Sequence, residues 1–324
     1  MQKKLFTWQF MYTNVQLHTP VMLLYVLQSK GSSPGRQGFF MAVNSDGEMY
    51  GSVGGGIMEH KMVELAKTRL QQSSNEHSIY HQYHDKTAAT QQSGMICSGQ
   101  QTIFMYTLQE KDMQPLQKII ETLQLNKNAT LQLSAEGLLW KGETADSNFY
   151  FELKEASNFL YREKIGYTHY LHIIGGGHCA LALSQLMSSM DFYIQLYEER
   201  TDLHTMVENN YVHKKNIVAS YSTLNHLIAG GSNIYVIIMT VGYRTDREAL
   251  RALLHTPFAY FGILGSKSKI EKMMQALLKE GVSTEKLQTL YAPAGVAIKS
   301  QTPEEIAVSI AAEIIKVKNN LSIT

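Results

Sequence analysis

A glycine-rich segment in the second half of the chain has the residue types and spacing of a phosphate-binding loop. Residues 175–180, GGGHCA, fit the pattern G-x-G-x-x-A directly after the strand-like run HYLHII. The first glycine of this pattern, Gly175, permits a tight turn, and Gly177 lets a phosphate approach the backbone. The helix expected to begin there offers unpaired N–H groups to an anion. We therefore expect Gly175, Gly177 and His178 to hold a phosphate.

An acidic pair follows this loop at the spacing of a ribose-binding residue. Glu198 and Glu199 come directly after the apolar run FYIQLY, about 20 residues beyond the loop. A carboxylate in this place bonds a ribose diol and repels a 2′-phosphate, so Glu198 favours NAD-like or adenosine ligands over NADP. The alternative is a scaffold in which the glycines serve only packing and a tight turn.

Two further loops follow the next strand-like runs. They read MTVGYRTD and GILGSKSK. Because ligands bind beyond the carboxyl ends of parallel strands, we expect these loops to face the same cleft as the first. Ordinary strand–helix turns with solvated cations are the alternative. The candidate ligand-binding residues in these loops are Thr240, Gly242, Gly265 and Ser266, with Arg244, Lys267 and Lys269 nearby.

The first half of the chain carries its own pair of glycine loops, GSSPGRQ (31–37) and GSVGGGIMEH (51–60). The turn signal Asp46-Gly47 between two strand-like runs predicts a hairpin, which would bring the two loops side by side. The second loop runs into a predicted helix and could cradle an anion. A purely structural role for these glycines is the alternative. The candidate residues are Ser32, Arg36, Gly54, Gly55, Gly56 and Glu59.

Composition excludes several classes of protein. In 324 residues, Lys+Arg 29 and Asp+Glu 28 leave a net charge of +1, which argues against a partner such as duplex nucleic acid. Only Cys97 and Cys179 occur, so a disulfide framework and a Cys-rich zinc module are excluded. No spacing assembles a catalytic constellation or a metal-ligand set, and no apolar run reaches the ~20 residues of a membrane helix. We therefore expect a cytoplasmic protein without a membrane partner.

The elements that must position these loops differ between the two halves. Strand-like and helix-like runs alternate from residue 169 onward, which predicts a Rossmann-like parallel sheet with helices on both faces. The first half mixes strands and helices as a smaller α+β domain. The polar stretch 154–166 marks the boundary, so the predicted domains are 1–165 and 166–324, in an α/β chain.

Together the loops resemble one family, the xanthine dehydrogenase accessory factors called XdhC/CoxI. The family's GSxPxxxG and GSVSGGCVE loops are matched by GSSPGRQG and GSVGGGIME, and its IxGAGHxAxAL by IIGGGHCALAL. MTVGYRTDREALRALL, YFGILGSKSK and APAGVAIKSQTPEEIAVSIAAEI match three further patterns in the same order. The chain departs from the family patterns at Ile57, Val241 and Tyr243, where the family often has Cys, His and His.

The resemblance implies a function in cofactor handling. Family members are described as binding the molybdenum cofactor, a pterin dithiolene carrying phosphate, and inserting it into molybdenum hydroxylases. This implies a non-catalytic insertion factor whose partner is an apoenzyme of the xanthine dehydrogenase type. A homodimer is the commonest assembly for such a chain. The Rossmann pattern alone would instead fit an NAD-dependent oxidoreductase, and a scaffold that binds only a protein partner is a third possibility.

Overall fold

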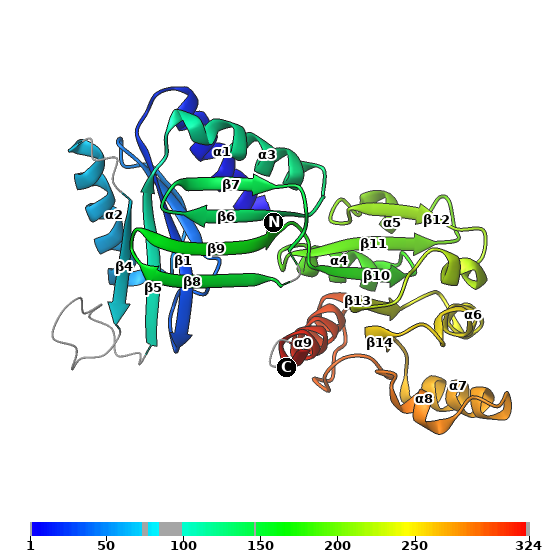
Figure 1. Ribbon diagram of the computed structural model, residues 1–324. Coiled ribbons are helices and arrows are strands. Elements are labelled where there is room, and N and C mark those ends of the chain that lie inside the picture. Colours follow the sequence, from blue (N-terminus) through cyan, green and yellow to red (C-terminus); the bar gives the residue numbers. More distant parts are fainter. Residues whose placement is uncertain (1, 73–76, 84–98, 146, 322–324) are drawn as a thin grey trace. The chain divides into compact units, whose positions relative to one another are not determined.

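The computed structural model describes residues 2–72, 77–83, 99–145 and 147–321. The chain divides into two units, Met1–Gly166 and Tyr167–Thr324 (Figure 1). Each unit has its own hydrophobic cores. No helix in the described ranges is long and apolar enough to cross a membrane.

The second unit is built on a five-stranded parallel sheet with the order β12-β11-β10-β13-β14. The central strand β10 is buried along its last four residues, as expected for a strand covered on both faces. Strand order reverses between β10 and β13, which makes their carboxyl ends the switch point of the sheet. The strands are β10 (His169–Ile174), β11 (Phe192–Glu198), β12 (Lys214–Ile217), β13 (Gly231–Ile238) and β14 (Phe258–Ile263).

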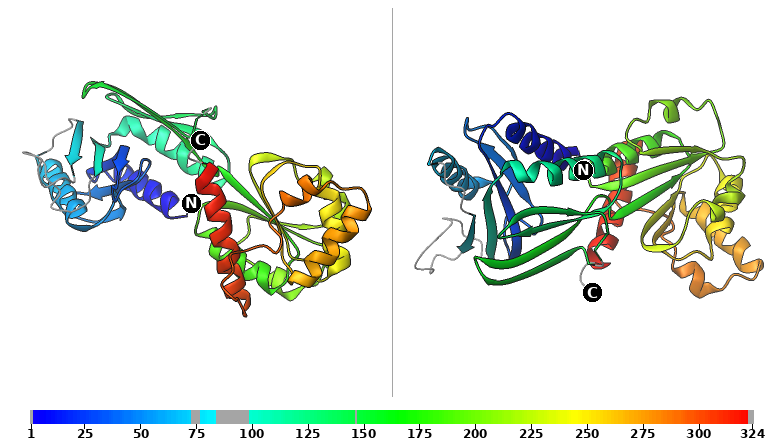
Figure 2. Two further views of the ribbon diagram at one scale, coloured as in Figure 1. Left: turned by 90° about the horizontal axis from the view of Figure 1, so that it is seen from below. Right: turned by 45° about the horizontal axis from the view of Figure 1, so that its top comes forward.

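Helices cover both faces of this sheet (Figure 2). The helices α4 (His178–Ser188) and α9 (Pro303–Leu321) contribute to the core on one face. The opposite core contains α6 (Tyr243–Leu253), α7 (Lys267–Lys279) and the 3-10 helix η2 (Tyr221–His226). The short helices are α5 (His204–Glu208) and α8 (Thr284–Gln288). The Rossmann-like half of the predicted α/β fold is confirmed.

The first unit contains an antiparallel sheet with the order β3-β2-β1-β5-β4. Its hairpin between β2 and β3 turns at Asp46-Gly47 as predicted, and Gly47 has the positive φ of 84° that favours glycine there. The strands are β1 (Val21–Gly31), β2 (Phe40–Asn44), β3 (Met49–Gly51), β4 (Ser78–Tyr83) and β5 (Gly99–Thr107).

The two faces of this sheet are covered differently. Helix α2 (Gly56–Gln71) packs its buried side chains on one face. The other face shares a core with α1 (Gln2–Gln16), α3 (Met113–Gln124) and a second antiparallel sheet of order β7-β6-β9-β8. The remaining elements are η1 (Glu110–Asp112), β6 (Ala129–Ser134), β7 (Gly137–Lys141), β8 (Phe149–Glu155) and β9 (Asn158–Ile165).

The polar stretch 154–166 is part of this second sheet. Its residues form the end of β8, a turn and the whole of β9. In β9 buried and half-buried side chains alternate, because one face of the strand packs on the core while the other is partly open to solvent. Polarity at this stretch therefore reflects a half-exposed strand.

Candidate functional site

The turn after β10 requires glycine at its first position. Gly175 has a φ of 104°, and its N–H donates to the Tyr197 carbonyl oxygen at 2.8 Å. A Cβ atom at Gly175 would lie 2.5 Å from the Met239 carbonyl oxygen and 2.8 Å from the Cα of Thr240. The loops after β10 and β13 are therefore in direct backbone contact at the switch point.

The helices that follow these two strands begin without side-chain caps. Gly177 precedes α4 and Gly242 precedes α6, and neither helix start receives a hydrogen bond from a capping side chain. A Cβ atom built on either glycine would have no neighbour within 4 Å. Each helix start thus presents free backbone donors and the positive end of its dipole to open space. His178, in the first turn of α4, is exposed beside them.

The loop after β14 differs because its helix is capped by the chain itself. The Ser266 hydroxyl accepts a hydrogen bond from the Lys269 N–H at 3.3 Å. Gly265 lies against the Lys269 side chain, since a Cβ there would meet Lys269 Cδ at 2.9 Å. The predicted residues Gly265 and Ser266 therefore border an N-terminus whose donors are partly used.

Glu198 is buried at the end of β11 and is engaged by protein donors. Its carboxylate accepts the Gly176 N–H at 2.7 Å, the Glu199 N–H at 3.0 Å and the Tyr221 hydroxyl at 3.3 Å. The Arg200 guanidinium binds both carboxylate oxygens, each at 2.9 Å. Burial by itself would raise the pKa of Glu198, but the hydrogen bonds from Arg200 and the backbone lower this pKa to about 2.

These hydrogen bonds change which polar group at the end of β11 a ligand can reach. The carboxylate expected to hold a ribose diol is only 1% exposed and orders the glycine loop through Gly176. The group that reaches solvent is the Arg200 guanidinium, whose side chain is 42% exposed. A ribose hydroxyl would reach Glu198 only if Arg200 moved away.

Sequence reasoning missed Asp246, which is fully buried in the first turn of α6. Its Oδ1 accepts the Thr240 N–H at 3.0 Å and the Thr240 hydroxyl at 2.5 Å. Its Oδ2 forms an ion pair with Lys269, which also donates to the Leu264 carbonyl oxygen at 3.2 Å. Asp246 thus joins the loops after β13 and β14, and Thr240 is tied inside this network. The sequence signal for this role is the acidic residue Asp246, four positions after the glycine that precedes α6.

The glycine loops of the first unit pack against each other as predicted. A Cβ at Gly35 would lie 2.0 Å from the Val53 carbonyl oxygen, and one at Gly54 would lie 2.6 Å from the Gly35 nitrogen. Backbone positions this close admit only glycine. Ser32 and Arg36 are exposed in the first loop, where Arg36 donates to the Gly31 carbonyl oxygen at 3.3 Å.

The predicted anion cradle in this unit is filled by the chain's own carboxylate. Glu59 Oε2 accepts the Val53 N–H at 2.9 Å, the Gly55 N–H at 3.0 Å and the Ser52 hydroxyl at 2.6 Å. The turn of Gly54, Gly55 and Gly56 has positive φ at all three residues. Glu59 therefore acts as an internal anion that holds the turn at the start of α2.

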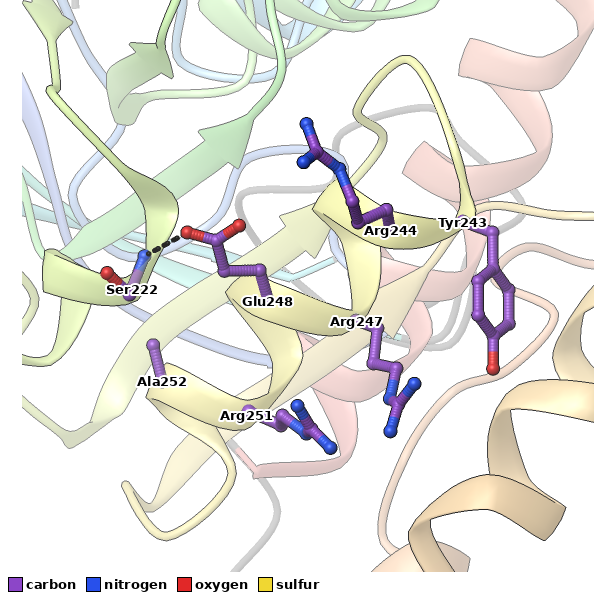
Figure 3. Close-up of a pocket in the computed structure, with 7 residues that line it drawn as sticks. All are labelled: Ser222, Tyr243, Arg244, Arg247, Glu248, Arg251 and Ala252. Carbon is purple, nitrogen blue, oxygen red and sulfur yellow. Dashed lines mark hydrogen bonds between the residues drawn. The ribbon is translucent and has the colours of Figure 1, made fainter.

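A pocket of about 500 Å³ lies on the outer side of α6 (Figure 3). Its charged groups are largely paired within the protein. Arg247 and Arg251 both bind Glu280, and Glu248 accepts the Ser222 N–H at 3.2 Å. The residues lining this pocket are Ser222, Tyr243, Arg244, Arg247, Glu248, Arg251 and Ala252.

The described residues offer little thiol or metal chemistry. Burial raises the pKa of the half-buried Cys179 thiol, and nearby Glu304 adds to this effect. Cys97 lies outside the described residues. Ile57 and Val241, which stand at family Cys and His positions, are exposed. Within the described ranges no three His, Cys, Asp or Glu side chains are grouped as metal ligands.

Comparison with known proteins decides the family. The profile described as the XdhC Rossmann domain matches residues 171–314, and that of the XdhC and CoxI family matches residues 15–82. The chain belongs to the XdhC and CoxI family. The first match includes the glycine loops after β10, β13 and β14, and the second includes the two glycine loops of the first unit.

Individual relatives are more distant. "Uncharacterized protein YqeB" of Escherichia coli (strain K12) is 26% identical over 305 residues, covering 93% of this chain and 44% of that protein. A probable xanthine dehydrogenase subunit of Bacillus subtilis (strain 168) is 30% identical over 87 residues, covering 27% of this chain and 24% of that protein. The chain therefore spans less than half of the length of these curated relatives.

A solved structure shows the same fold. The crystal structure of a xanthine dehydrogenase from Bacillus halodurans matches with a TM-score of 0.71 and 22% sequence identity. The match covers 97% of this chain and 96% of that chain. The fold of this solved structure is thus shared by nearly the whole chain.

Proposed function

We propose that this protein is an accessory factor that binds the molybdenum cofactor, or a related phosphorylated nucleotide, for maturation of a molybdenum hydroxylase. Membership in the XdhC and CoxI family supports this proposal, as do relatives whose names refer to xanthine dehydrogenase. The observation that carries it is the pair of uncapped helix starts at Gly177 and Gly242, beyond adjacent strands of a parallel sheet.

The residues present fit the phosphate end of such a cofactor. The open space at Gly177 and Gly242 lets an anion approach the first-turn N–H groups of α4 and α6. The exposed His178 side chain lies beside these N–H groups and can add a hydrogen bond from its ring. The cofactor itself supplies the metal and dithiolene chemistry, which acts in the hydroxylase. This chain's residues bind and orient the phosphate.

The direct test is retention of the pterin. The full-length protein is incubated anaerobically with molybdenum cofactor released from a molybdenum hydroxylase, and the protein-bound pterin is measured by its fluorescence after oxidation. We expect retention by the wild-type protein and loss in Gly177→Ala, because the new methyl group occupies the space in front of the helix start. Absence of retention by the wild type, with and without the apoenzyme, would refute the proposal.

An NAD-dependent oxidoreductase is the second candidate, and the strand order of the second unit favours it. Its expected ribose ligand, Glu198, is occupied by Arg200, which weighs against NAD. Titration with NADH, followed by protein fluorescence, separates the two functions. Saturable quenching, together with turnover of a small alcohol or aldehyde, would favour the oxidoreductase.

A further inference from the structure

The edge of the first sheet is exposed and bordered by apolar side chains. Strand β3 forms this edge, and its three residues are all exposed. Helix α1 lies beside β3, where the Phe10 and Tyr50 rings are 4.8 Å apart. The exposed apolar side chains here include Phe6 at 58% and Tyr50 at 50%. Single exposed apolar residues are common on protein surfaces, but a contiguous set beside an open strand edge indicates an interaction surface.

A groove runs between α1 and β3, which we call the edge groove. It consists of two adjoining pockets of about 540 and 390 Å³ that share Phe6 and Tyr50. Because the first pocket lies along the start of α1 and the second along its end, the groove follows a helix roughly 22 Å long. The shared residues Phe6 and Tyr50 therefore form the apolar centre of the groove, with one pocket extending from it toward each end of α1.

The two ends of the edge groove carry opposite charge. Lys3 and Lys4 line the pocket at the start of α1. Asp46 and Glu48, from the turn between β2 and β3, line the pocket at the end of α1, and both are exposed. In the described structure Lys4 has only a long contact with Glu163, at 3.8 Å, so the basic end keeps most of its charge available.

We propose that the edge groove is the interface between two copies of this chain, related by a two-fold axis near Tyr50. In an isologous interface the two-fold rotation places each end of the groove against the opposite end of the partner's groove. Attraction at both ends therefore requires one basic and one acidic end on the same surface. The half-turn places Lys3 and Lys4 of each copy against Asp46 and Glu48 of the other. The aromatic centres meet between these pairs, which excludes water and covers the open strand edge.

The charge pattern distinguishes a second copy from another partner. An unrelated protein could use either end alone, whereas self-association requires both ends on one surface and equal spacing from the centre. This requirement makes the proposal testable by reversing the charges. It does not depend on the proposed cofactor function, because the residues involved belong to the first unit, whereas the helix starts proposed to hold the phosphate belong to the second.

The test measures the mass of the full chain in solution by light scattering and by sedimentation. The wild type should have the mass of two 36.5-kDa chains. The variant Lys3→Glu/Lys4→Glu and the variant Asp46→Lys/Glu48→Lys should each weaken dimerisation by about tenfold or more, because like charges then face each other at both ends. Mixing these two variants should restore a dimer, since each heterodimer end again pairs opposite charges.

The control is Lys214→Glu/Lys215→Glu on β12, an edge strand of the parallel sheet. It makes the same change of charge as Lys3→Glu/Lys4→Glu and should leave the mass unchanged. Thermal unfolding of every variant checks that each is folded, and restoration on mixing excludes misfolding as the cause of dissociation. A wild type that stays monomeric up to about 100 µM would overturn the proposal. So would a dimer that both charge reversals leave intact, or variants that do not recombine.

Discussion

At the residue scale, the glycines in the loop after β10 have different roles. Gly175 occupies a left-handed conformation against the backbone of Met239, whereas Gly177 has a φ of −73° that any residue adopts and faces open space. The first is required by the fold. The second is free of structural demands, so its openness is available for a ligand.

This difference predicts opposite effects of the same substitution. Gly175→Ala should lower the melting temperature by roughly 2–12 °C, because strain and a backbone clash cost about 1–3 kcal/mol. Gly177→Ala should leave the melting temperature within about 2 °C of the wild type and abolish pterin retention. Thermal unfolding and the retention assay measure both effects. A Gly177→Ala protein that still retains the cofactor would show that this loop is structural.

Glu198 gives a prediction about pH. Its folded pKa of about 2 lies below the ordinary value of 4.5, so ionised Glu198 stabilises the fold above pH 4.5, and this stabilisation disappears as the pH falls toward 2. Glu198→Gln should therefore lower the free energy of unfolding by about 2 kcal/mol at pH 7. Denaturant unfolding of both proteins at pH 7, 5 and 3 should show the difference shrinking below pH 4.5. A difference that is constant with pH would contradict the role of the charge.

At the element scale, a carboxylate side chain holds the start of a helix in each unit. Asp246 and Lys269 connect the starts of α6 and α7, and Glu59 holds the turn before α2. In each place a charged side chain satisfies backbone or side-chain donors that would otherwise lack partners. These contacts fix how neighbouring elements begin.

The ion pair should show strong coupling in a double-mutant cycle. Lys269→Met leaves the carboxylate of Asp246 buried and unpaired, so it should lower the free energy of unfolding by about 3 kcal/mol. Asp246→Asn keeps an acceptor for Thr240. Combined with Lys269→Met, it should recover at least about 1 kcal/mol of that loss. Urea unfolding of the two single variants and the double variant measures the coupling, and additive losses would exclude it.

Glu59 should stabilise the start of α2 and have no effect on the second unit. Glu59→Ala removes the acceptor of two backbone N–H groups, which should lower stability by about 1–2 kcal/mol, as for loss of a helix cap. Hydrogen exchange should accelerate in the first turn of α2 and remain unchanged in α4. Glu59→Gln retains an oxygen acceptor and serves as the control. Equal exchange in all three proteins would contradict this role.

At the scale of the whole molecule, the chain consists of two units with separate cores. The core clusters of β1 with its neighbouring sheet and helices lie within Met1–Gly166, and those of the parallel sheet lie within Tyr167–Thr324. About 150 residues with cores of their own suffice for independent folding. The residues proposed to hold the phosphate, Gly177, His178 and Gly242, all belong to the second unit.

We therefore expect a fragment of residues 167–324 to fold alone. It should unfold cooperatively on heating, with loss of near-UV and far-UV circular dichroism at the same temperature. Because the helix starts at Gly177 and Gly242 both lie in this fragment, it should also retain a phosphorylated pterin, and its Gly177→Ala variant should not. A fragment with native-like helix content but no cooperative transition would show that the first unit is needed for packing.

The sequence by itself determined the local features of this protein. Alternating apolar runs predicted the parallel sheet of the second unit and placed its strands β10 and β11, and the Asp46-Gly47 turn predicted the hairpin that brings the two loops of the first unit together. These features depend on backbone conformation and on burial periodicity, which neighbouring residues specify. The ordered motifs also sufficed to assign the family.

Only the tertiary structure decided which polar groups remain free. Glu59 fills the cradle expected to take an anion, Arg200 occupies the carboxylate expected to take a ribose, and Asp246 ties up Thr240. Meanwhile the helix starts at Gly177 and Gly242 stay open. A hydrogen-bonding group is satisfied by whatever lies within about 3 Å in space, including residues far away in the sequence. Motif spacing therefore locates a loop, and the surrounding fold determines whether that loop can still bind a ligand.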